Sequence, residues 1–130
     1  MSVNKENMRL FVAALRSGEY EQGRYRLTTI QADSVQHCCL GVACEVALRH
    51  GVQMEIGVAP VPGHPGLTKR VYNAQSLFLP LAVQQWLGVD NDNLMIHGES
   101  ASTLNDDSHW TFSEIAEGIV KTYELEGEPE

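Results

Sequence analysis

The sequence has few of the features that mark secreted, membrane-bound or nucleic-acid-binding proteins. It has only three cysteines in 130 residues, two of them adjacent, which favours reduced thiols over a disulfide framework. The first ten residues, MSVNKENMRL, lack the apolar run of a secretory signal. No window approaches the ~20 consecutive apolar residues that a membrane-spanning helix needs. We therefore expect a cytoplasmic protein with no membrane partner.

Positive charge is scarce in the later part of the chain. Residues 81–130 contain eleven Asp and Glu but a single base, Lys121, whereas residues 1–80 carry eight Lys and Arg against six acids. The net charge of the whole chain is −8. Because duplex DNA and RNA are bound through basic surfaces, this acidity argues against a nucleic-acid duplex as partner. It leaves room for a basic pocket in the first part of the chain.

Helical periodicity is strongest near the two ends of the chain. The apolar spacing after Asn4 predicts an amphipathic helix that ends at Gly18. Thr111 and Glu114 form a capping box that predicts the start of a second amphipathic helix. Between them, LGVACEVALRHG is apolar nearly all round, which predicts a central buried helix. A short fourth helix is expected between Pro80 and Gly88.

Short strands are expected between these helices. EYEQGRYRLTTI alternates with period two and predicts a strand with Arg24 and Arg26 on one face. Further candidate strands are VQMEIGV, RVYNAQSLFL and the apolar run at 94–96, whereas APVPGHPG predicts a loop. The rest of 89–108 is polar and predicts turns. The pattern indicates a single α+β domain over 1–125 and an acidic tail at 126–130 that frays.

The stretch HCCLGV, residues 37–42, allows three interpretations. A zinc site is disfavoured, because Cys39 and Cys44 are too far apart to share a helical face and no second cysteine pair completes a tetrahedral set. In the simplest interpretation the cysteines fill the core as small apolar side chains, and Gly41 permits a close backbone approach. We therefore expect no bound metal and no cofactor.

The third interpretation is a reactive thiol. Cys38 or Cys39 lies where the central helix is expected to begin, and unpaired amides at a helix start stabilise a thiolate. His109 would act as the base, with Asn105 or Asp106 to orient its imidazole. This constellation predicts a cysteine-dependent hydrolase or transferase with an accessible thiol of low pKa.

Four basic residues offer a different chemistry. Arg24 and Arg26 are expected to project together, and Lys69 and Arg70 follow the Pro-Gly loop. Guanidinium groups match phosphate and carboxylate groups in a bidentate manner, so these residues are candidates to line a pocket for an anionic small ligand such as a nucleotide. The alternative is that they pair with the many acids of the C-terminal part.

Four motifs occur in order along residues 8–120: FVAALRSGEYEQGRYRL, HCCLGVACEVA, LPLAVQQWLG and LNDDSHWTFSEIAEGI. In this combination the chain resembles a widespread family of small uncharacterised phage and prophage proteins. It departs from the family pattern at Asp107–Trp110 and at His37, where the family often has a small and an aromatic residue respectively. The resemblance implies a phage-borne accessory protein expressed in a bacterial cytoplasm, and it implies no reaction.

Three functions follow as alternatives. The first is a non-enzymatic accessory protein that binds a host protein or captures an anionic small ligand, with counter-defence as one role. A basic host partner would be favoured if the acids of the second half formed one exposed patch. The acids concerned are Asp90, Asp92, Asp106, Asp107, Glu117 and Glu124. The second function is the thiol-dependent enzyme, and the third is a structural domain that caps an assembly.

Overall fold

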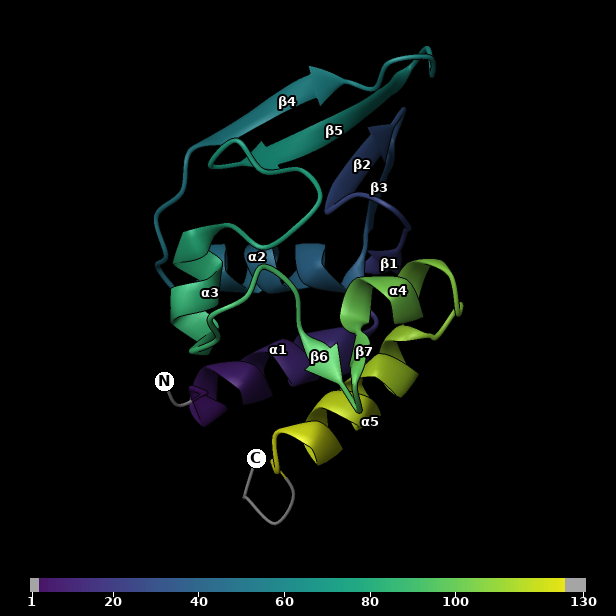
Figure 1. Cartoon of the computed structure of the whole chain (residues 1–130). Coiled ribbons are helices and arrows are strands. Elements are labelled where there is room, and N and C mark those ends of the chain that lie inside the picture. The colour runs from purple at the N-terminus through teal and green to yellow at the C-terminus, as the bar shows by residue number, and fades with distance from the viewer. Residues whose placement is uncertain (1–2, 126–130) are drawn as a thin grey trace.

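The chain folds into a group of packed helices with a sheet that stands over them, as the computed structural model of residues 3–125 shows (Figure 1). Within that range it forms α1 (Lys5–Ser17), α2 (Cys39–Arg49), α3 (Leu81–Leu87), α4 (Ala101–Asp106) and α5 (Phe112–Thr122). The strands are β1 (Glu21–Gln22), β2 (Thr28–Gln31), β3 (Ser34–His37), β4 (Ile56–Pro60), β5 (Leu67–Tyr72), β6 (Met95–Ile96) and β7 (Glu99–Ser100). The expected single α+β domain is confirmed. The acidic tail at 126–130 lies outside the described residues.

The helices at the two ends begin and end where the local signals predict. The Asn4 side chain accepts a hydrogen bond from the Asn7 amide at 3.0 Å, and Gly18 ends α1 in the left-handed region at φ 80°. Thr111 and Glu114 make the reciprocal bonds of a capping box at the start of α5. The two helices lie side by side in Figure 1. None of the helices within residues 3–125 is long and apolar enough to cross a bilayer.

Helix α2 is the buried centre of the fold, as its apolar sequence predicts. It follows β3 directly, and Cys38 serves as its N-cap. Gly41 meets the backbone of Leu27: a Cβ at position 41 would lie 1.8 Å from the Leu27 carbonyl oxygen. Only glycine permits this approach, so the prediction that Gly41 allows close packing is confirmed.

The main sheet has five strands in the order β1-β3-β2-β5-β4. The β1–β3 pair is parallel and the other pairs are antiparallel, with Thr28 opposite His37 and Ile56 opposite Tyr72. We call the side of this sheet that faces α2 the inner face. Alternation and register place on it Thr28, Ile30, Val35, His37, Ile56, Val58, Thr68, Arg70 and Tyr72. β4 and β5 extend beyond the helices (Figure 1), and β4 is the last strand.

The expected strand through Arg24 and Arg26 is wrong. β1 ends at Gln22, and Tyr25 adopts φ 73°, a left-handed conformation that breaks an extended segment. The Tyr25 amide donates to the Asp106 carboxylate at 3.0 Å, a contact across 81 residues. A tertiary hydrogen bond therefore overrides the local alternation and turns 23–27 into a loop.

Two further boundaries differ from the sequence prediction. β5 begins at Leu67 and ends at Tyr72, because Asn73 and Ala74 take φ values of 49° and 70° that cannot continue a strand. Helix α4 lies in the segment for which turns were expected. The Ser100 side chain accepts from the Thr103 amide at 3.3 Å and caps the helix at its start.

Candidate functional site

A hydrogen-bonded polar chain joins the inner face of the sheet to α2. Thr28 Oγ1 lies 2.8 Å from His37 Nδ1 and 2.7 Å from the Tyr72 hydroxyl. The Tyr72 hydroxyl donates to Glu45 Oε2 at 2.5 Å, and Arg70 Nη1 donates to the same oxygen at 2.7 Å. We call these five residues the polar chain. They come from four elements, β2, β3, α2 and β5.

The carboxylate end fixes the direction of every proton in the polar chain. Ionised Glu45 can only accept, so Tyr72 donates to it and the Tyr72 oxygen accepts from Thr28. The proton of Thr28 is then committed, so His37 Nδ1 must carry a hydrogen and donate to Thr28. For the neutral imidazole, this order specifies the tautomer protonated on Nδ1.

Burial governs the titration of the polar chain. It lowers the pKa of His37, an effect that the Glu45 carboxylate partly offsets and that Arg70 reinforces. Burial also raises the pKa of Tyr72, which together with its hydrogen bond to Glu45 keeps the phenol protonated. Burial therefore favours the uncharged forms of both His37 and Tyr72 in the polar chain.

The lowered pKa of His37 predicts a loss of stability in mild acid. As the pH falls, the unfolded chain protonates this histidine near pH 6.5, whereas the folded chain protonates it only at a lower pH. The stability that the neutral His37 contributes is therefore fully present above pH 6.5. It is lost as the pH falls through the folded pKa. Urea unfolding at pH 7.5 and 5.0 should show a larger loss for the wild type than for His37→Asn, which keeps an N–H donor for Thr28 but does not titrate. Equal losses in both proteins would contradict the assignment.

Tyr20 connects the polar chain to a groove between α1 and α2. Its ring meets His37 edge to face at 5.3 Å, and the Arg49 guanidinium lies 5.5 Å from its centre. The Tyr20 hydroxyl is buried without a hydrogen-bond partner. Arg49 also lies 3.5 Å from Glu19. The cation is thus held between an aromatic face and a carboxylate at the edge of the groove.

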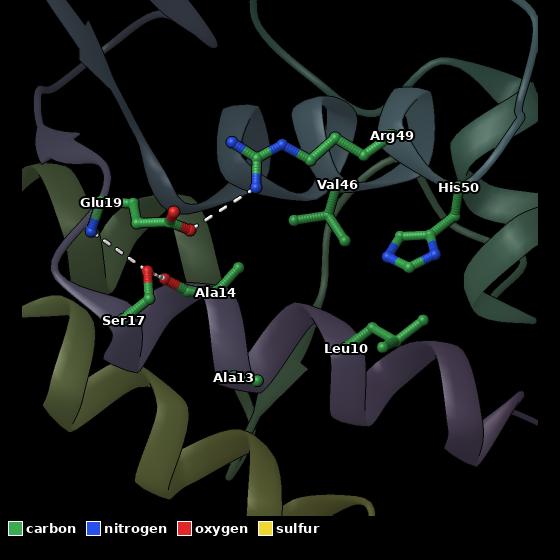
Figure 2. A pocket seen from close by; sticks show the side chains of 8 residues that line it. All are labelled: Leu10, Ala13, Ala14, Ser17, Glu19, Val46, Arg49 and His50. Atoms are coloured by element: carbon green, nitrogen blue, oxygen red, sulfur yellow. Dashed lines mark hydrogen bonds and ion pairs between the residues drawn. The ribbon is translucent and has the colours of Figure 1, made fainter.

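The groove itself has an apolar floor and a polar rim (Figure 2). Its volume is about 230 Å³. The floor is made by Leu10, Ala13, Ala14 and Val46, and the rim by Ser17, Glu19, Arg49 and His50. Figure 2 shows Arg49 running back along α2 toward Glu19, while His50, which stacks on Trp86 at 6.1 Å, stands at the other end. The groove offers a cation and an imidazole to a ligand.

All three thiols are closed off from solvent. Cys38 is 3% exposed and Cys39 and Cys44 are fully buried. Burial raises the pKa of Cys38 to about 12 and raises the pKa of the other two well above the usual range. His109 lies exposed between α4 and α5, and the Asp106 carboxylate already accepts from Tyr25 and Asn105. Cys38 and Cys39 therefore do not form a solvent-accessible nucleophile with His109 as its base.

Buried, protonated thiols should not react while the protein is folded. Iodoacetamide at neutral pH should leave all three cysteines unmodified in native protein and alkylate all three after unfolding in urea. The measurement is the mass of the intact protein after each treatment. Rapid labelling of Cys38 or Cys39 in the native protein would restore the enzyme hypothesis.

The four predicted basic residues do not converge on one pocket. Lys69 and Arg70 are neighbours on β5, so their side chains point to opposite faces of the sheet. Arg70 is bonded to Glu45, which lies in the first half of the chain. Arg24 and Arg26 lie in the loop before β2, Arg24 exposed and Arg26 half-buried.

The six acids are spread over the molecule rather than gathered in one patch. Asp90 and Asp92 follow α3, whereas Asp106 and Asp107 end α4, on the other side of the view in Figure 1. Glu117, on α5, lies 3.9 Å from Arg16. Among residues 3–125, no group of three or more His, Cys, Asp and Glu side chains is placed to hold a metal ion.

A second polar network locks the loop after β1 to α4, and no periodicity or spacing in the sequence predicts it. The Gln22 amide donates to Asn105 Oδ1 and to the Trp110 carbonyl, each at 2.8 Å. Asn105 Nδ2 donates to the Gly23 carbonyl at 2.9 Å. We call Gln22, Gly23, Asn105 and Asp106 the amide lock. Gln22 and Gly23 belong to the first of the four sequence motifs and Asn105 and Asp106 to the last, so the amide lock gives these residues a structural role.

The family comparison covers this whole arrangement. A family model described as a domain of unknown function (DUF8296) matches residues 3–123, and the chain belongs to that family. The match runs from α1 to α5 and includes the polar chain, the groove and the amide lock. No curated protein and no solved structure matches the chain.

Proposed function

We propose that this family member is a phage-encoded, non-enzymatic accessory protein of the bacterial cytoplasm that binds a host protein at the free edge of β4. The observation that carries the proposal is an edge strand with unpaired backbone groups and exposed apolar side chains. Val58 is 61% exposed and Ile56 43% exposed, although both lie on the inner face of the sheet. An enzymatic function has less support, because the three thiols and the Tyr72 side chain are buried and cannot reach a substrate in solvent.

The register of β4 defines which backbone groups are free. The Glu55 carbonyl accepts from Asn73 at 2.8 Å, and the Val61 amide donates to Leu67 at 3.0 Å. In an antiparallel pair, hydrogen-bonded positions alternate, so residues 57 and 59 bond to β5 between these two points. The N–H and C=O groups of Ile56 and Val58 therefore point away from β5, along the outer edge of the sheet.

Such an edge accepts an extended segment of another protein. The added strand bonds to the free backbone groups, and its alternate side chains pack against the exposed apolar ones. The host segment should therefore carry apolar residues opposite Ile56 and Val58. Specificity comes from these side chains, whereas the backbone bonds supply much of the affinity.

Site-specific photo-crosslinking in the bacterial host tests the proposal. A benzophenone amino acid at position 58 should cross-link to one defined host peptide, identified by mass spectrometry. The matched control is position 81, where Leu81 is 65% exposed on α3, away from the edge. The same peptide should be absent there. No host peptide at position 58, or the same peptides at both positions, would overturn the proposal.

The groove in Figure 2 supports a second candidate, capture of an anionic small ligand. Arg49 and His50 lie at its rim above an apolar floor. A native mass spectrum of protein purified gently from bacteria should then show an added mass that disappears on denaturation. Arg49→Gln should lose that mass, whereas Arg24→Gln, an exposed cation outside the groove, should retain it. A bare apoprotein mass would count against ligand capture.

A further inference from the structure

We infer that the free edge of β4 also pairs with itself: two copies of the chain join β4 to β4 in antiparallel fashion, about a two-fold axis at Gly57. The inference rests on the proposed function, because both use the same edge. It adds a competing occupant, a second copy of the chain. Self-association would then mask the edge from the host segment.

The outward backbone groups of this edge complement themselves. Ile56 and Val58 each present one free N–H and one free C=O, as the register of β4 requires. With Gly57 on the axis, Ile56 of each copy lies opposite Val58 of the other. Every outward N–H of these residues then meets an outward C=O. Pro60 has no N–H to offer, which limits the ladder to this short stretch.

The side chains allow the close approach that this pairing demands. Gly57 would face Gly57 of the second copy at a non-hydrogen-bonded position, where Cα atoms approach to about 4.5 Å. Nothing lies within 4 Å of the place where a Gly57 Cβ would be, so the space is open. On the inner face, Ile56 would cover Val58 of the second copy. The two most exposed apolar groups of the sheet would bury each other.

Charge complements the fit on the opposite face of the sheet. Ala59 is paired with Lys69 of β5, so the lysine lies directly beside a small residue at the edge. In the two-fold register, Glu55 of the second copy lies on the other side of Ala59, and alternation places it on the same face. Lys69 and Glu55 of opposite copies can reach each other across Ala59, twice in each dimer. Lys69 lies on β5, one strand inside the edge, and only the small Ala59 side chain separates it from the Glu55 of the second copy.

Cysteine cross-linking tests the geometry directly. Gly57→Cys places one thiol of each copy at the axis, within the Cα separation that a disulfide requires. With oxidised glutathione, this variant should form a covalent dimer. Leu81→Cys, the control on α3, should form much less. The natural cysteines are buried and should not contribute. Equal cross-linking of both variants would overturn the two-fold register.

Sedimentation velocity of the full chain over a range of concentrations measures the reversible dimer. Val58→Pro removes an outward N–H without breaking the β5 ladder, and the loss occurs twice in the dimer. The dissociation constant should rise by about tenfold or more, whereas Leu81→Asp should leave it unchanged. A wild type that is monomeric throughout overturns the inference but leaves the host cross-link at position 58 intact. A dimer without any host cross-link instead refutes the proposed function alone.

Discussion

Gly41→Ala should destabilise the protein by more than ~3 kcal/mol, or prevent it from folding. The added Cβ would lie 1.8 Å from the Leu27 carbonyl oxygen and 2.6 Å from its carbonyl carbon. Both atoms belong to the backbone, which no side-chain rotation can move aside. The same carbonyl accepts from the Cys38 amide at 3.1 Å, so moving α2 away would also break the bond at its first turn. Urea unfolding followed by circular dichroism measures the loss.

Gly118→Ala is the matched control, because it also adds a methyl group inside a helix. Its Cβ would meet Ile96 Cγ2 at 2.6 Å and Trp110 Cζ3 at 3.4 Å. Both are side-chain atoms, and a rotation of the buried Ile96 side chain can relieve the closer contact, whereas a backbone atom cannot rotate away. Alanine also favours the helical backbone over glycine by about 1 kcal/mol. We therefore expect a much smaller loss than at position 41. A Gly41→Ala protein as stable as Gly118→Ala would mean that α2 does not lie against Leu27.

Asn105→Asp should cost about 3–5 kcal/mol through the amide lock. Asn105 is fully buried, and its Nδ2 donates to the Gly23 carbonyl and, at 2.8 Å, to the Asp106 carboxylate. A carboxylate in its place turns this donor into an acceptor that faces two other acceptors. It also buries a negative charge beside another one. The free energy of unfolding in urea at pH 7.5 gives the magnitude.

Asn91→Asp supplies the control with the same change of charge. Asn91 is exposed, and its side-chain oxygen accepts from the Asn93 amide at 3.2 Å, a role that a carboxylate keeps. This variant should be nearly as stable as the wild type. In Asn105→Asp the deficit should shrink on acidification, because a protonated carboxyl regains a donor. If Asn105→Asp and Asn91→Asp lost the same free energy of unfolding, the loss would come from the change in net charge alone.

Helices α1, α2, α3 and α5 were predictable because their signals are local, whereas α4 lies in a segment for which the sequence predicts turns. Asn4, Gly18, Thr111 and Glu114 act within a few residues of themselves, and the structure uses each of them as the sequence indicates. The apolar segment after the cysteines likewise identified the buried centre of the fold. Cys38, Cys39 and Cys44 fill that centre, as the simplest interpretation held. These features depend on propensity and periodicity, which one sequence displays in full.

The failures depend on contacts between distant segments. The strand through Arg24 and Arg26 was a reasonable inference from alternation, but a bond from Tyr25 to Asp106 reshapes that backbone. The candidate basic pocket does not gather all four residues, because Lys69 and Arg70 occupy successive positions of β5, which begins at Leu67 rather than at Arg70. Successive residues of a strand point to opposite faces of the sheet, so a strand that begins at Leu67 separates the side chains of Lys69 and Arg70.

The polar chain had only a weak signature in the sequence. Glu45 interrupts an otherwise apolar helix, and Tyr72 follows directly after Arg70 and Val71 in an apparently ordinary strand. Nothing in the sequence indicates that Glu45 and Tyr72 share a hydrogen bond, because the contact spans 27 residues and two elements. Buried polar groups need hydrogen-bond partners, so a charged residue in an apolar helix indicates that Glu45 has a partner. The sequence does not identify that partner.

The placement of α1 has a consequence for how the chain matures on the ribosome. Helix α1 lies beside α5, and the N-terminus of α1 is tied to α3 through bonds to the Leu87 and Trp86 carbonyls. At about 5–20 residues per second, roughly 5–20 s separate the synthesis of α1 from that of α5. During this interval the apolar stripe of α1 has no finished docking surface. The apolar stripe of α1 is therefore covered completely only after α5 has been synthesised.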